Sequence, residues 1–205
     1  LRCNYAKKSH MEYLFTIFHR LNTGGAKLTN QEIRNCIYNG TFNAFLKEAV
    51  EYENYLNLFN VDTEKKDRFA NEELVLRFLS FTYNLDKYKG QLSKFLNDFM
   101  DSYRKTSPEN IEKFRELFQR TIDLIYTKIL GSKPLPTLSK ATTEALFVGV
   151  AKNLENLEKE TNDDLKHRYK SLRENELFSV NSLKEGLAQK DKVITRLNKS
   201  IEIFG

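Results

Sequence analysis

The segment SPENIEKFRELFQRTIDLIYTKILG, residues 107–131, decides the fold class of this chain. Its apolar side chains recur three or four residues apart, at Ile111, Phe114, Leu117, Phe118, Ile122, Ile125 and Ile129. This spacing places them on one face of an α-helix. Ser107 is a typical cap before a proline at the first helical position, and Gly131 can end the helix in the left-handed conformation. The segment therefore predicts a long amphipathic helix that packs on a core.

The same apolar period extends to both sides of this segment. It predicts one helix that ends near Asn22, one from Thr29 to Gly40, and a third that Thr41 caps. Further helices are expected around Leu74–Thr82, Leu92–Phe99, Ser139–Leu157, Leu165–Leu172 and Ile194–Phe204, with a polar loop over residues 60–70. No segment alternates at period two, and the chain has only 8 Gly and 3 Pro. These observations predict an all-α fold, an irregular multi-helix bundle without a sheet.

The segment Lys133-Pro134-Leu135-Pro136 is the one proline-rich part of the chain. A residue that precedes proline is driven away from helical geometry, so this segment is expected to be a rigid connector. It divides a helical core, residues 1–132, from a C-terminal helical subdomain of the same unit, residues 133–205.

Composition restricts the function classes only loosely. The 205 residues include 33 Lys and Arg against 28 Asp and Glu, a net charge of +5, which suits nucleotide or nucleic-acid partners but also an ordinary solvated surface. No apolar run is long enough for a membrane span, and no signal-peptide core is present, so a cytoplasmic protein with reduced thiols at Cys3 and Cys36 is expected. Because the chain begins Leu1-Arg2, we expect it to be a fragment of a larger protein.

The segment from Phe18 to Arg34 carries the strongest candidate site. Thr29 and Glu32 form a capping-box pattern, and backbone N–H groups at such a helix start favour an anion. The predicted phosphate-binding residues are Arg20, Asn22, Thr23, Gly24, Gly25, Lys27 and Arg34, on a surface loop at the edge of a groove. A helix-loop-helix hinge with a solvated loop is the alternative, and the physics of the segment alone favours it.

Two basic stripes are weaker candidates for contacts with a DNA backbone. One consists of Lys166, Lys170 and Arg173, and the other of Lys192, Arg196 and Lys199. Solvated helix faces with partners three or four residues away explain the same pattern. The histidines His10, His19 and His167 have no partner at metal-ligand spacing, so no metal site is predicted.

Three segments together resemble a known family. The run Phe18-x-x-Leu21-Asn22-x-x-Gly25-x-x-Leu28-x-x-x-Glu32-Ile33, the run Glu73-Leu74-Val75-Leu76-Arg77-Phe78, and Tyr88-Lys89-Gly90 followed by Phe95–Met100 are similar to motifs of the GmrSD N-terminal domain family. Members of that family occur in bacterial modification-dependent restriction and other anti-phage systems. The resemblance is strong over residues 13–103, and Val193–Leu197 is a weaker match.

The resemblance implies that the chain is the helical C-terminal part of a ParB-like domain. In the family, an upstream half carries an Asp-Gly-Gln-Gln-Arg motif tied to nucleotide hydrolysis, and residues 1–205 contain no such motif. ParB relatives use a Glu-Asn pair to hold metal and triphosphate. Here Asn22 keeps its position, but Leu21 replaces the Glu, which argues against metal binding while a phosphate contact by Asn22 stays expected.

The function that follows is part of a nucleotide-dependent, DNA-directed restriction or anti-phage defence protein. The helices would close one wall of a nucleotide site whose catalytic half is missing. The fragment is expected to have no catalytic residue, cofactor or activity of its own, whereas the parent would bind a nucleoside triphosphate with Mg²⁺ and act as an NTP hydrolase, an endonuclease or both. Apolar surface that once met the missing half would favour a homodimer. The alternative is a non-catalytic helical module that binds a partner protein or DNA.

Overall fold

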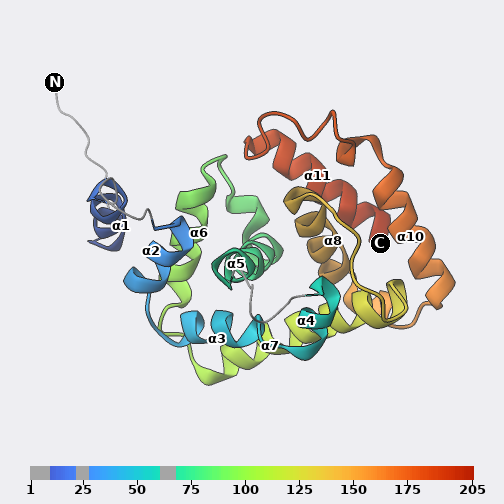
Figure 1. Ribbon diagram of the computed structural model, residues 1–205, viewed down its shortest axis with the longest axis horizontal. Helices are drawn as coiled ribbons and strands as arrows, with labels where there is room; N and C mark the ends of the chain where they lie inside the picture. Colours follow the sequence, from blue (N-terminus) through green and yellow to red (C-terminus); the bar gives the residue numbers. More distant parts are fainter. Residues whose placement is uncertain (1–9, 22–27, 61–67) are drawn as a thin grey trace.

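The computed structural model describes residues 10–21, 28–60 and 68–205, and its described part is entirely helical, without a strand, as predicted (Figure 1). The α-helices of this part are α1 (His10–Leu21), α2 (Asn30–Ile37), α3 (Thr41–Ala49), α4 (Glu53–Phe59), α5 (Arg68–Asn84), α6 (Leu92–Tyr103), α7 (Pro108–Asp123), α8 (Lys140–Lys152), α9 (Leu154–Leu157), α10 (Asn162–Glu174) and α11 (Lys190–Phe204). Short helices η1 (Leu85–Lys87), η2 (Leu124–Ile129) and η3 (Glu176–Phe178) extend or connect them. None of these helices is long and apolar enough to cross a membrane.

Helix α5 lies at the centre of the bundle. It packs against α2, α3 and α6 on one side and against α8 on the other, and α8 in turn packs against α11 (Figure 1). Helix α7 contacts α3, α4 and α8. Helices α5 and α7 therefore both join the N-terminal helices to α8.

The long helix predicted over residues 107–131 is present. Ser107 caps it by accepting a hydrogen bond from the N–H of Asn110, and Pro108 occupies the first turn. After Asp123 the helix continues as the π-helical segment η2, which the apolar period did not predict. Gly131 follows with a φ of 60°, in the left-handed conformation expected at this end.

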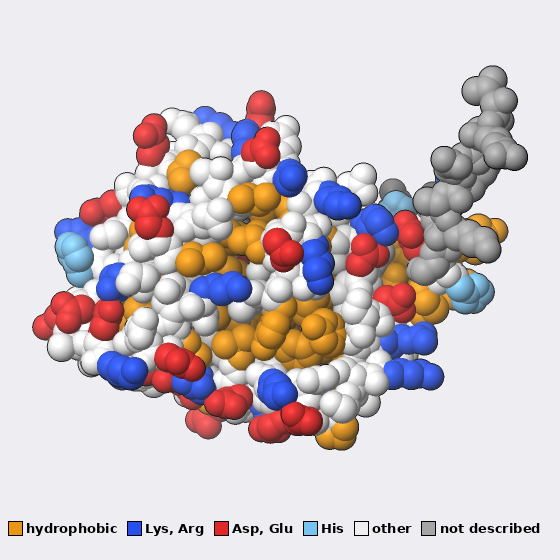
Figure 2. Space-filling view, turned by 180° about the vertical axis from the view of Figure 1, so that it is seen from behind, with side chains coloured by type: hydrophobic (Ala, Val, Ile, Leu, Met, Phe, Trp, Pro, Cys, Tyr) orange, Lys and Arg blue, Asp and Glu red, His pale blue; other side chains and the backbone are white. Residues whose placement is uncertain are grey.

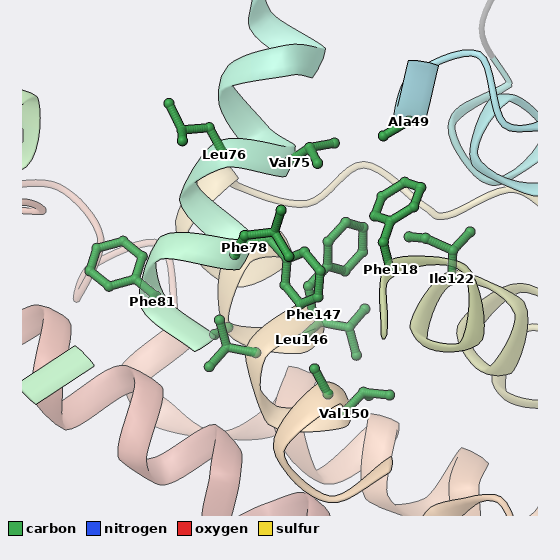
Figure 3. Packing of buried hydrophobic residues seen from close by; sticks show 14 of the residues in the cluster. Ala49, Val75, Leu76, Phe78, Phe81, Phe118, Ile122, Leu146, Phe147 and Val150 are labelled. Carbon is green, nitrogen blue, oxygen red and sulfur yellow. The ribbon is translucent and has the colours of Figure 1, made fainter. Parts of the chain in front are cut away.

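Aromatic side chains from three helices form the middle of the core. Phe78 of α5, Phe118 of α7 and Phe147 of α8 point toward one another (Figure 3). The ring centroids of Phe78 and Phe147 are 5.9 Å apart with the rings nearly perpendicular, a favourable edge-to-face arrangement. This core contains residues from both sides of the proline-rich connector, and the N–H of Leu135 in that connector donates to the carbonyl of Leu58 at 2.7 Å.

Three predicted boundaries need correction. Gly40, not Thr41, is the N-cap of α3. A Cβ at position 40 would lie 2.1 Å from the carbonyl oxygen of Arg104, so this close approach requires glycine. The hydroxyl of Thr41 instead donates to the carbonyl of Thr106. The predicted loop over residues 60–70 is helical from Arg68 onward, and the helix predicted over residues 139–157 is interrupted at Asn153.

Candidate functional site

The segment predicted to bind phosphate connects α1 to α2 in the sequence, and these two helices pack against each other. Its residues Asn22, Thr23, Gly24, Gly25 and Lys27 lie outside the described residues. Arg20 is exposed in the last turn of α1, before the segment that connects the two helices. The described flanks therefore place one predicted cation on the surface beside this segment.

The start of α2 has the predicted capping box. The Thr29 hydroxyl accepts a hydrogen bond from the N–H of Glu32 at 3.2 Å, and the Glu32 carboxylate accepts one from the N–H of Thr29 at 2.6 Å. Each side chain thus satisfies a backbone donor that the helix itself cannot use. This arrangement fixes the first turn of α2 and the direction from which residue 28 enters it.

Arg34 does not line a surface groove, which corrects the prediction for this residue. It is 1% exposed, and its guanidinium donates to Asn97 of α6 at 2.9 Å, to Glu73 of α5 at 2.9 Å and to Gln31 at 3.1 Å. Burial lowers the pKa of Arg34, although the negative charge of Glu73 opposes this effect. Arg34 faces inward because α5 and α6 place acceptors beside it, so it anchors α2 rather than receiving a phosphate.

Glu73 connects this anchor to a second ion pair, between α5 and α8. Its other carboxylate oxygen lies 3.6 Å from a guanidinium nitrogen of Arg77, one turn further along α5. Arg77 donates through Nε to Glu144 of α8 at 2.7 Å. The chain Arg34–Glu73–Arg77–Glu144 therefore joins α2, α5 and α8 by ion pairs. It is called the buried charge chain below because its two ends, Arg34 and Glu144, are buried, whereas Glu73 and Arg77 in its middle are partly exposed.

Glu144 was not singled out from the sequence. It is 1% exposed in α8, where the residues from Ala141 to Ala151 are all buried. Burial raises the pKa of Glu144, and the charge of Arg77 limits this rise. A lone acidic residue directly before the apolar run Ala145–Val150 was the available signal, because a carboxylate at a buried helical position requires a cation beside it.

The buried charge chain is suited to holding helices together rather than to chemistry. Each of its members is paired with an opposite charge. A hollow of 190 Å³ lies beside it, lined among others by Glu73, Arg77 and Thr143. Within the described part of the chain, no group of three His, Cys, Asp or Glu side chains could hold a metal ion.

The first basic stripe is on the surface of α10, largely neutralised by its own helix. Lys166 pairs with Asp163 at 3.4 Å and Lys170 with Glu174 at 3.8 Å. Arg173 lies over the ring of Tyr169, 5.9 Å from its centroid. Such exposed pairs contribute little stability and leave the cations free to exchange partners.

In the second stripe, the two lysines reach the surface of α11, whereas the arginine is buried. Lys192 donates to the carbonyl of Glu185 at 2.9 Å, and Lys199 pairs with Glu202 at 2.6 Å. Arg196, by contrast, is only 5% exposed and donates to the carbonyl of Leu187 at 2.7 Å. Arg196 therefore does not belong to an exposed stripe with the two lysines, because the segment before α11 covers it.

No protein-family model, no curated protein and no solved structure matches this chain.

Proposed function

We propose that this chain is the helical part of a nucleotide-dependent, DNA-directed restriction or anti-phage defence protein, where it closes one wall of a nucleotide site. The resemblance of three segments to the GmrSD N-terminal domain family suggests this function. One observation carries the proposal further: side chains from all three segments, or directly beside them, meet at Arg34. Its partners Glu73 and Asn97 lie within the second and third segments.

The geometry gives these segments a positioning role. Arg34 follows Thr29 by five residues, which is about 7.5 Å along a helix. The helix start that the capping box fixes is therefore also held from within the bundle by α5 and α6. A phosphate site that uses backbone donors needs such a fixed support, since movement of the donors would weaken every contact.

In the proposed site, Asn22, Thr23, Gly24 and Gly25 contact the phosphates, with Arg20 and Lys27 as nearby cations. A half that carries the Asp-Gly-Gln-Gln-Arg motif supplies the catalytic groups and binds the nucleoside triphosphate with Mg²⁺. The parent protein is then an NTP hydrolase, an endonuclease or both. The helices described above transmit the nucleotide state through α2 and the buried charge chain.

A second candidate is a non-catalytic helical module that docks a protein partner, a second copy of the chain or DNA. Figure 2 shows an apolar area in the middle of one face, with charged side chains of both signs around it. Uncovered apolar area with a polar surround is typical of a surface that another protein covers. The exposed cations Lys166, Lys170 and Lys192 and the partly exposed Lys199 would serve contacts with DNA in this case.

Binding of a fluorescent, non-hydrolysable nucleoside triphosphate with Mg²⁺ to the complete protein tests the first proposal. Asn22→Ala should weaken binding by about tenfold or more, because a charge-assisted hydrogen bond is lost. Asn57→Ala, an exposed position on α4, is the matched control and should leave affinity unchanged. Unchanged affinity in Asn22→Ala would refute the site. A coding sequence that lacks the Asp-Gly-Gln-Gln-Arg motif upstream of Leu1 would favour the second candidate.

A further inference from the structure

A hollow of 560 Å³ lies between the segment that precedes α11 and the first turns of that helix. Leu177, Ser182, Lys184, Lys192, Thr195 and Arg196 are among the residues that line it. Sites for small molecules typically have about 300–1,000 Å³, so the hollow has the size of a site for a mononucleotide-sized ligand. In Figure 1 this segment is the orange loop that leads into the red helix α11.

The wall of the hollow is held in place from two directions. The Tyr88 hydroxyl donates to the carbonyl of Ala188 at 2.6 Å, and Arg196 donates to the neighbouring carbonyl of Leu187 at 2.7 Å. Lys192 donates to the carbonyl of Glu185 at 2.9 Å. Three side chains thus fix the backbone of residues 185–188 over the start of α11, as a preformed site requires.

Arg196 lacks a counter-charge of its own. Although it is only 5% exposed, none of its guanidinium nitrogens lies within 4.0 Å of a carboxylate in residues 10–21, 28–60 and 68–205. The nearby buried carboxylate, Glu144, is engaged with Arg77 at 2.7 Å. Burial lowers the pKa of Arg196, the negative charge of Glu144 opposes this effect in part, and repulsion from Arg77 adds to it. A buried guanidinium stays protonated, so its desolvation calls for an anion beside it.

The rest of the lining suits an anion as well. Lys184 and Lys192 add two cations against the carboxylates of Glu185 and Asp191, so the lining with Arg196 has a formal excess of one positive charge. Helix α11 begins at Lys190 without a side-chain cap, which leaves its first backbone donors available. Leu177 supplies an apolar surface for the uncharged part of a ligand.

We propose that this hollow binds a small phosphate-bearing ligand of mononucleotide size, with the phosphate paired to Arg196. A guanidinium can bind phosphate through two parallel hydrogen bonds, which gives both affinity and orientation. Duplex DNA does not fit this role, because its phosphates cannot reach a side chain that is covered by residues 185–188. The site lies in residues 177–196 and is independent of the nucleotide site proposed at residues 20–27.

Thermal unfolding and calorimetric titration of the full chain test this proposal. The probes are AMP and inorganic phosphate, with succinate for the carboxylate alternative and sodium chloride at equal ionic strength as the baseline. AMP should give a saturable rise in Tm above the chloride baseline, with inorganic phosphate weaker and succinate weakest. A rise with phosphate equal to that with AMP, and without saturation, would indicate an adventitious ion only and would overturn the proposal.

Variants separate the site from general charge effects. Arg196→Met should lower AMP affinity by about tenfold or more while leaving the ligand-free Tm equal or higher, because it removes an unpaired buried charge. Lys199→Met, a partly exposed position later on α11 and outside the lining of the hollow, is the matched control and should bind AMP normally. If Arg196→Met fails to fold, Lys192→Met should still weaken binding by about threefold. The site would be refuted if Arg196→Met, or Lys192→Met where Arg196→Met does not fold, retained the AMP affinity of the wild type. It would also be refuted if Lys199→Met lost as much AMP affinity as these variants.

Discussion

Removal of one partner from the buried charge chain should have a large effect on stability. Arg77→Met keeps the aliphatic volume of the side chain but deletes the guanidinium that lies 2.7 Å from Glu144. Glu73 remains paired with Arg34 at 2.9 Å, so Glu144 is the carboxylate that loses its partner. Because Glu144 is 1% exposed, water cannot replace the lost hydrogen bond.

The expected magnitude follows from the burial of that carboxylate. Breaking a buried ion pair on one side costs about 3–5 kcal/mol, a large part of the roughly 5–15 kcal/mol that stabilises a typical domain. For a chain of this size, such a loss lowers Tm by roughly 6–20 °C. The double variant Arg77→Met/Glu144→Met removes the stranded charge and should be more stable than Arg77→Met, with a coupling energy of about 1–3 kcal/mol.

The loss in Arg77→Met should also depend on pH. Burial already raises the pKa of Glu144, and without Arg77 only the weaker attraction of Arg196 opposes the rise. The pKa of a glutamate in the unfolded chain is about 4.3. A carboxyl with a higher pKa in the folded state stabilises the fold at pH values below the unfolded-state pKa, and this stabilisation is lost as pH rises through the folded-state pKa. The stability difference between wild type and Arg77→Met should therefore be smaller near pH 4 than near pH 7.

Urea unfolding followed by far-UV circular dichroism measures these differences at each pH. Equal m-values would show that the change lies in folded-state stability. A loss below about 1 kcal/mol in Arg77→Met, or strictly additive effects in the double variant, would refute the reasoning, because Glu144 would then be solvated rather than stranded.

Three further changes and one assay test other parts of the structure. Thr29→Ala should lower the free energy of unfolding by about 1 kcal/mol through loss of the cap, and an unchanged urea midpoint would contradict this. Gly149→Ala should lower the free energy of unfolding, because the new Cβ would lie 2.3 Å from the Ser200 hydroxyl oxygen. Overpacking costs about 1–3 kcal/mol, which outweighs the gain of up to about 1 kcal/mol in helix propensity. Hydrogen bonds from Arg120 lower the pKa of Glu158, so the ionised Glu158 stabilises the fold above the unfolded-state pKa, and this stabilisation is lost as pH falls through the folded-state pKa. Glu158→Gln should therefore flatten the acid side of the Tm–pH profile. A profile identical to that of the wild type would argue against the ion pair of Arg120 with Glu158. Residues 1–205 alone should release no phosphate from a nucleoside triphosphate with Mg²⁺, and steady release that Asn22→Ala abolishes would show otherwise.

The sequence by itself determined the elements whose signals are local. The apolar period placed the long helix, Ser107 and Pro108 marked its start, and Gly131 marked its end, as the structure confirms. The capping box of Thr29 and Glu32 was also predicted from the sequence, since both of its hydrogen bonds join residues that are three positions apart. Interactions within one helical turn depend on neighbours in the chain, and the sequence displays those directly.

The direction of long charged side chains was decided only by the tertiary structure. Arg34 and Arg196 occupy helical positions that the sequence predicted, yet both are buried, whereas each was expected to face a ligand at the surface. Arg34 turns inward because Asn97 lies beside it, 63 residues away in sequence, and Glu144 finds Arg77 across a separation of 67 residues. Arg34 and Glu144 are stable in the interior because distant helices bring their partners, and no local pattern records which helices will meet.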